Sequence, residues 1–165
     1  MRRLIPLVLL AAAAAGCGSS RHAAATTTTP APPKPAPGRV LYQGGPWAVV
    51  LDCGKAAALH LVGGRWQPDR SGKVKIAILG PDPVVHAQVP QVAAEMRGPG
   101  ALVEEGLWVD GRELLEKGGG LSRSDVTVYG APDTKLAPGR HVAVAYGRTA
   151  NTGTAVAWSF RIVPS

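Results

Sequence analysis

The sequence of 165 residues has few aromatic side chains, only two cysteines and no apolar run that could cross a membrane. A membrane-spanning helix takes about 20 apolar residues, and the apolar run at residues 4–15 is shorter than that. With only Cys17 and Cys53, a scaffold held by several disulfides is excluded. Long helical periodicity is also missing, so a helical bundle is not expected.

Motifs for catalysis or nucleotide binding are missing as well. No G-x-S-x-G, S-x-x-K or GxxxxGK[ST] occurs. Glu104 and Glu105 are adjacent, so in a strand they would point to opposite faces, and we expect both to be solvated. The sequence therefore predicts no enzyme, no catalytic residue and no cofactor.

Acidic residues are fewer than basic ones, 11 against 18. A mature chain that begins at Cys17 would lose Arg2 and Arg3 and keep a net charge of +5. This surplus favours anionic partners such as phospholipid headgroups or acidic polymers. The basic residues are scattered along the sequence rather than gathered in a stripe, so no nucleic-acid partner is predicted.

The first residues have the pattern of a secretory leader. Arg2 and Arg3 precede the apolar run at 4–15, which has the length of a signal-peptide core. The run ends in Ala14-Ala15-Gly16-Cys17, which resembles a bacterial lipobox. This resemblance implies a signal peptide at 1–16, palmitate-type acyl chains on Cys17 and a protein anchored outside the cell membrane. Two acyl chains would hold it stably. The alternative is an ordinary signal peptide cleaved in the alanine run.

Residues 17–38 are rich in threonine and proline and contain no aliphatic side chain larger than alanine. Nothing in this stretch could bury enough apolar surface to offset the entropy of ordering, so we expect a disordered tether. Its reach would be roughly 25 Å as a coil and roughly 65 Å if fully extended.

Short strands separated by turn signals are expected from residue 39 onward, which predicts an all-β fold. Residues 39–72 have the pattern of a small strand meander with a turn at 52–55. The strongest local signal is Asp110-Gly111 between two apolar runs, which favours a type I′ hairpin. Alternation predicts inward faces at Val74, Ile76 and Ile78, at Val92, Ala94 and Met96, and at Val156, Trp158, Phe160 and Ile162. Residues 98–106, 116–124 and 147–154 are expected to be end loops.

Two stretches near the C-terminus carry a resemblance to a fold family. Residues 136–142 contain a Leu-x-Pro-Gly corner before a strand, and 157–162 close the chain on an alternating aromatic strand. They resemble the last two strands of bacterial Ig-like and fibronectin-type domains. The resemblance implies an immunoglobulin-like β-sandwich at 73–165 that binds or scaffolds. Because a small ribbon of strands is marginally stable alone, we expect the meander at 39–72 to pack on the sandwich or to extend one of its sheets.

Candidate partner-binding residues are arginines beside the expected end loops. They are Arg97, Arg123, Arg140 and Arg148, and the expected partner is an envelope protein or an anionic polymer of the envelope. For Cys53 two roles remain open: a thiol that pairs between chains, or a small buried apolar side chain.

A metal-handling protein is the alternative. The closing segment also resembles CopC-like copper-resistance proteins, which place a histidine in an Asp-Gly-His stretch before the last strand. Here that stretch is residues 148–151, which carry no ligand. His60, His86 and His141 lie on three separate segments without ligand spacing, so no metal site is predicted. We expect His141 to close the Pro-Gly corner by packing or hydrogen bonding.

Overall fold

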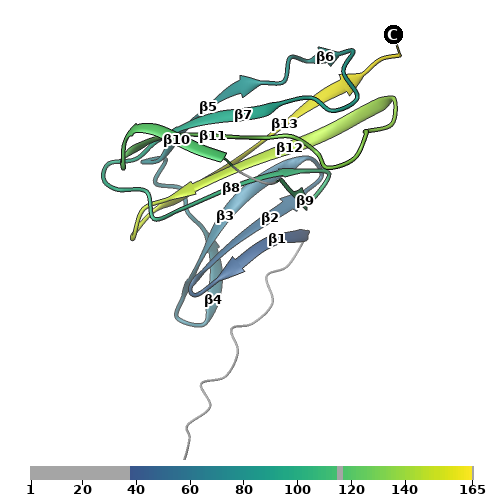
Figure 1. Ribbon diagram of the computed structural model, residues 1–165. Helices are drawn as coiled ribbons and strands as arrows, with labels where there is room; N and C mark the ends of the chain where they lie inside the picture. Colours follow the sequence, from purple (N-terminus) through teal and green to yellow (C-terminus); the bar gives the residue numbers. More distant parts are fainter. Residues whose placement is uncertain (1–37, 115–116, 165) are drawn as a thin grey trace, which may run out of the picture. The chain divides into compact units, whose positions relative to one another are not determined.

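The computed structural model describes residues 38–114 and 117–164, and within these ranges every regular element is a β-strand (Figure 1). The prediction of an all-β chain is confirmed. In the same ranges no helix is long and apolar enough to cross a membrane. Cys17 and the expected tether, apart from Gly38, lie outside the described residues. The strands form three sheets.

The first sheet, called the meander sheet, is antiparallel throughout. Its order is β1 (Arg39–Gly44), β2 (Trp47–Asp52), β3 (Lys55–Val62) and β4 (Arg65–Pro68). The turn predicted at 52–55 joins β2 to β3. Its central residues, Cys53 and Gly54, have φ angles of 47° and 75°, the left-handed conformation that two-residue hairpins favour.

The second sheet, called the outer sheet, is also antiparallel. Its order is β10 (Lys117–Ser122), β11 (Asp125–Gly130), β7 (Val92–Arg97) and β5 (Lys75–Gly80). The third, called the central sheet, has the order β6 (Val84–Val85), β13 (Gly153–Ile162), β12 (Gly139–Arg148), β8 (Glu104–Val109) and β9 (Arg112–Glu113). Only β6 and β13 are parallel among the described pairs.

The outer and central sheets have the strand order of an immunoglobulin-like sandwich. In that fold strands A, B, E and D form one sheet and strands C, F and G the other. Here β5, β7, β11 and β10 take the first set of places, and β8, β12 and β13 the second. Strands β6 and β9 extend the central sheet at its two edges. The predicted fold class is therefore confirmed.

The main core lies between the outer and central sheets. The alternation predicted for β7 is confirmed, because Val92, Ala94 and Met96 are fully buried. Phe160 and Ile162 of β13 enter the same core, and Trp158 packs against it while partly exposed.

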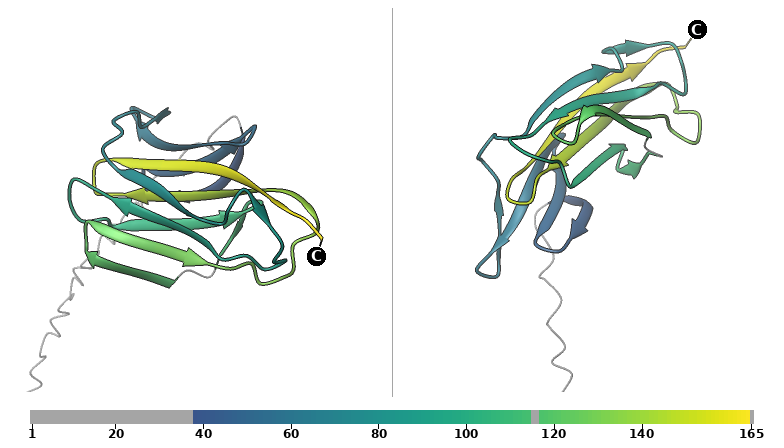
Figure 2. Two further views of the ribbon diagram at one scale, coloured as in Figure 1. Left: turned by 90° about the horizontal axis from the view of Figure 1, so that it is seen from above. Right: turned by 60° about the vertical axis from the view of Figure 1, so that its left-hand side comes forward.

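The opposite face of the central sheet is covered by the meander sheet (Figure 2). Val49 and Ala58 of the meander sheet pack against Trp108, Val144 and Tyr146 of the central sheet. Strand β12 is therefore buried on both faces, with alanines toward the outer sheet and larger side chains toward the meander sheet. A third cluster, Ala48, Val50 and Leu59 with Trp66 beside it, lies within the meander sheet.

The connection from β4 to β5 is tied to the turn between β12 and β13. Asp69 Oδ2 accepts hydrogen bonds from Thr152 Oγ1 and Gly153 N, both at 2.8 Å, and Asp69 Oδ1 accepts one from Ser71 N at 2.8 Å. Burial alone would raise the pKa of Asp69, but these donors outweigh it and lower the pKa. The carboxylate therefore joins the meander sheet to the sandwich at this end, called the Thr152 end.

Three local expectations were wrong. Residues 117–122 of the expected end loop at 116–124 form edge strand β10. Ile78 was expected to point into the core, but 45% of it is exposed at the edge of the outer sheet. Glu104 and Glu105 belong to one strand as assumed, but Glu104 is half-buried in an ion pair with Arg148 rather than solvated.

We expect the segment Ala31–Ser165 to fold by itself, because it forms one compact unit that contains all three cores. Its far-UV circular dichroism spectrum should be that of β structure, and its unfolding in urea should be cooperative. A helical spectrum, or a gradual loss of signal without a transition, would contradict the fold.

Replacing Trp108 by alanine should lower the free energy of unfolding by about 3–5 kcal/mol. Trp108 is 3% exposed and fills the interface between the meander and central sheets. Val62→Ala is the control, because Val62 lies at the end of β3 and is 49% exposed; its effect should stay within about 0.5 kcal/mol. Equal effects in urea denaturation would mean that the meander sheet does not cover this face.

Candidate functional site

The predicted Asp110-Gly111 hairpin is present and marks one end of the sandwich. Both residues have positive φ angles, 49° and 75°, as a type I′ turn requires. The turn joins β8 to β9, with Val109 opposite Arg112. This end of the central sheet, called the Asp110 end, lies opposite the Thr152 end, because β12 and β13 run the length of the sheet between them.

The start of the described chain is fixed at this turn. Arg39, the first residue of β1, donates from Nη1 to the Asp110 carbonyl oxygen at 2.8 Å and from Nη2 to the Gly111 carbonyl oxygen at 3.0 Å. The planar guanidinium suits two neighbouring acceptors. The described chain therefore begins at the Asp110 end.

His141 closes the Pro-Gly corner by hydrogen bonding, as predicted. Its Nε2 lies 2.8 Å from the Ala137 carbonyl oxygen and its Nδ1 lies 2.7 Å from Asp110 Oδ2. Asp110 Oδ1 also accepts a hydrogen bond from Val142 N at 3.0 Å. In many immunoglobulin-like domains a tyrosine at the same corner bonds to the backbone a few residues upstream. Here the imidazole makes that contact and adds an ion pair to the hairpin turn.

Both imidazole nitrogens of His141 face oxygen acceptors, so only the doubly protonated ring can donate to both. Burial lowers the pKa of His141, but the hydrogen bonds to Asp110 and Ala137 and the carboxylate charge outweigh it, and the pKa is raised above 6.5. His141 is 8% exposed. The charged form therefore stabilises the corner.

A surface hollow of about 510 Å³ lies beside this corner. Basic and acidic side chains are mixed along its lining; they are Arg39, Arg112, Lys135 and His141, and Asp110, Glu113 and Asp133. Because side chains of both signs line it, this hollow has no clear preference for an anion or a cation.

The structure separates the four candidate arginines. Arg97 forms ion pairs with Glu95 and Asp125, and Arg148 pairs with Glu104 at 2.6 Å. Arg123 is exposed at the β10–β11 turn near the Thr152 end. Arg140 lies at the other end, eight residues along β12 from Arg148, about 26 Å for an extended strand. The four do not gather in one cluster.

Arg148 belongs to a contact between layers. Its guanidinium carbon lies 5.9 Å from the centre of the Trp47 ring. The Nε atom of the same guanidinium group forms the ion pair with Glu104. His60 stacks on Trp47 with ring centres 4.4 Å apart. Burial and the nearby Glu104 carboxylate raise the pKa of Tyr42 to about 12. The contacts of Arg148 with Trp47 and of Tyr42 with Glu104 join the meander sheet to the central sheet.

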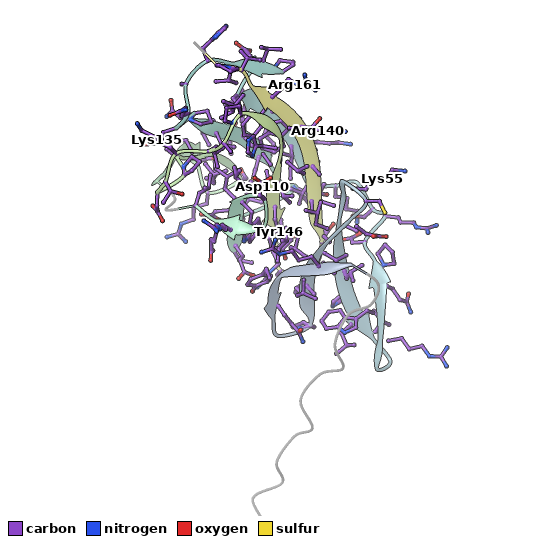
Figure 3. The ribbon with its side chains drawn as sticks, turned by 90° about the vertical axis from the view of Figure 1, so that its right-hand side faces the viewer. Lys55, Asp110, Lys135, Arg140, Tyr146 and Arg161 are labelled. Atoms are coloured by element: carbon purple, nitrogen blue, oxygen red, sulfur yellow. The ribbon has the colours of Figure 1, made fainter. Side chains whose placement is uncertain are left out.

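Arg140 has a different neighbour, which the sequence did not identify. It lies directly opposite Arg161 in the β12–β13 ladder. Figure 3 places both side chains on the same side of the central sheet, pointing away from it, with Lys55 on that side as well. The register of the ladder brings these two arginines together, and nothing in their separation along the sequence indicates it.

Cys53 and the three histidines occupy separate places. The Cys53 thiol is free and exposed at the β2–β3 turn. Of the two roles left open, the buried apolar side chain is therefore wrong, and pairing between chains stays a prediction. His60 lies on Trp47, His141 in the corner and His86 in the exposed segment after β6. Over residues 38–114 and 117–164, no three potential metal ligands lie together.

In comparisons with known proteins, no protein-family model and no curated protein sequence matches this chain.

The His141–Asp110 pair should make the free energy of unfolding depend on pH. Because the pKa of His141 is raised in the folded state, its contribution is complete below about pH 6.5 and is lost as the pH rises through the folded-state pKa. Asp110→Asn keeps a residue that tolerates positive φ and still accepts from Val142. We expect this variant to lose about 1 kcal/mol at pH 6, since the carboxylate is half-exposed, and less at pH 9.

Urea denaturation at several pH values measures the difference, and NMR titration of His141 gives its pKa directly. Asp133→Asn is the matched control, because Asp133 lines the same hollow without a hydrogen bond to His141. A wild-type pKa at or below 6.5 for His141, or a loss in Asp110→Asn that grows with pH, would contradict the assignment.

Proposed function

We propose that this chain is an extracytoplasmic lipoprotein, anchored to the cell membrane through acylated Cys17, whose immunoglobulin-like sandwich is a non-catalytic binding module. The observation that carries the anchor is the apolar run at 4–15, which ends at Ala14-Ala15-Gly16-Cys17. A run of this length is too short to span a membrane, and a lipid on Cys17 would take over the anchoring.

The way the chain meets its fold supports a tethered arrangement. The expected tether ends at Gly38, and the next residue is Arg39, which holds the Asp110-Gly111 turn with both terminal nitrogens. A tether of roughly 25–65 Å keeps the sandwich near the membrane. Such confinement raises its effective concentration toward neighbouring molecules, so a weak interface is sufficient.

The proposal of a binding module rests on fold-level analogy, because immunoglobulin-like sandwiches present their edges and end loops to partners. The net charge of +5 in a chain starting at Cys17 favours an anionic partner. Of the four candidate arginines, Arg97 and Arg148 are engaged in ion pairs, so Arg123 and Arg140 are the better candidates for such contacts.

Cys17→Ala should abolish lipidation and leave an unprocessed precursor. Mass spectrometry of the N-terminal peptide from native membranes should find a wild-type chain that begins at lipid-bearing Cys17. Cys53→Ala is the matched control and should keep the lipid, because Cys53 lies in the β2–β3 turn of the folded part. A mature wild-type chain that begins beyond Cys17 with an unmodified residue would rule out the anchor.

A further inference from the structure

The meander sheet leaves one end of the central sheet uncovered. Coverage extends to Val142 of β12 and Ala157 of β13, which pack against the meander sheet. Two residues beyond Val142 and four beyond Ala157, Arg140 and Arg161 face each other, and Arg161 is also the register partner of Val84 in β6. Register partners share a face of the sheet, so these three exposed side chains form one row across three strands.

The two arginines of this row are not neutralised. Among the described residues, the ion pairs of basic side chains involve Arg97, His141 and Arg148. Asp52 and Asp82, on the neighbouring turns, are exposed and form no ion pair with the row. Like charges directly opposite each other destabilise a sheet, and guanidinium groups stay charged at any physiological pH. Arg140 and Arg161 therefore form a local surplus of positive charge, and a bound anion would reduce the repulsion between them.

The row borders an exposed apolar edge. Four of the six exposed large apolar side chains of the described residues lie here: Ile78, Leu79, Val84 and Val89, each 44–56% exposed. Leu79, Val84 and Val89 line one shallow hollow. A second hollow of about 310 Å³, lined by Ile78, Leu79, Trp158 and Ser159, lies between this edge and β13. Exposed apolar side chains gathered at one edge mark an interaction surface.

The same end receives the N-terminal part of the chain. Asp110 exchanges backbone and side-chain hydrogen bonds with Val142, which is two residues from Arg140 on β12. Arg39 is bound to the same turn. Two residues along a strand correspond to about 7 Å, so the turn that binds Arg39, the second described residue, lies close to the arginine row.

We propose that this surface, formed by Arg140, Arg161, Val84 and Leu79, docks on anionic phospholipid in the membrane that carries the anchor. The guanidinium groups bind headgroup phosphates in bidentate fashion, and the apolar edge enters the headgroup region. The inference rests on the proposed anchor at Cys17 for its setting. The lipid and the surface then act at the same end of the molecule, so the anchored domain lies on the membrane rather than standing clear of it.

The test uses the compact unit Ala31–Ser165, which carries no lipid, so that binding reports the surface alone. We expect it to sediment at low salt with vesicles of equal parts phosphatidylglycerol and phosphatidylcholine, and not with phosphatidylcholine alone. Arg140→Gln with Arg161→Gln should weaken binding at least about tenfold. Arg70→Gln with Arg123→Gln removes the same charge from exposed positions near the Thr152 end and should change binding less than about twofold.

A second pair of variants tests the apolar edge. Leu79→Ser with Val84→Ser should weaken vesicle binding several-fold at constant charge. Val62→Ser with Val103→Ser is the control, because both valines are about half-exposed but lie elsewhere, and it should bind like the wild type. Circular dichroism of every variant verifies that it is folded.

Equal loss of binding in the two arginine double variants would overturn the proposed surface, because it would indicate attraction by net charge alone. Wild-type binding to soluble polyphosphate but not to the anionic vesicles would also overturn it, and would favour an anionic polymer as partner. Neither result bears on Cys17, whose lipidation is read from the N-terminal peptide. Failure of the anchor and failure of the surface are therefore distinguishable.

Discussion

The burial of the central sheet on both faces is the constraint on which the other features depend. Strand β12 alternates small residues toward the main core with Val144 and Tyr146 toward the meander sheet. Such packing requires close approach, and glycines provide it. A side chain at Gly147 would meet Met96, and one at Gly106 would meet the ring of Trp108. In this chain of 165 residues, the central sheet therefore contributes side chains to two cores, one on each of its faces.

Polar contacts fix the meander sheet at both ends of this stack. At the Thr152 end, Asp69 accepts two hydrogen bonds, from Thr152 Oγ1 and Gly153 N, that connect the β4–β5 segment to the β12–β13 turn. At the Asp110 end, Arg39 binds the hairpin turn, and His141 binds Asp110 from the other side. Apolar packing between sheets has little directional preference, so these hydrogen bonds are what define the position of the meander sheet along the central one.

Sequence patterns predicted the elements better than their partners. Alternation in β7 and the Asp110-Gly111 turn were recognisable because each depends on local chemistry. Strand β10 was missed, since Gly118–Gly120 have low strand propensity and are held there by pairing with β11. The pairing of Arg140 with Arg161 depends on the register of two long strands, which no short stretch of sequence specifies. The ion pairs of Arg97 and Arg148 depend on neighbouring strands in the same way.

The distribution of charge follows from the layering. Where the meander sheet covers the central sheet, an arginine can remain only if it is paired, and Arg148 is held between Glu104 and Trp47. Where the cover ends, solvent hydrates the guanidinium groups, and Arg140 and Arg161 can stand opposite each other without an acid. On this face of the central sheet, the length of the meander strands thus determines which arginine is structural and which are free to bind. Because Arg39 is bound to the turn at the uncovered end, the free arginines lie at the end where the described chain begins.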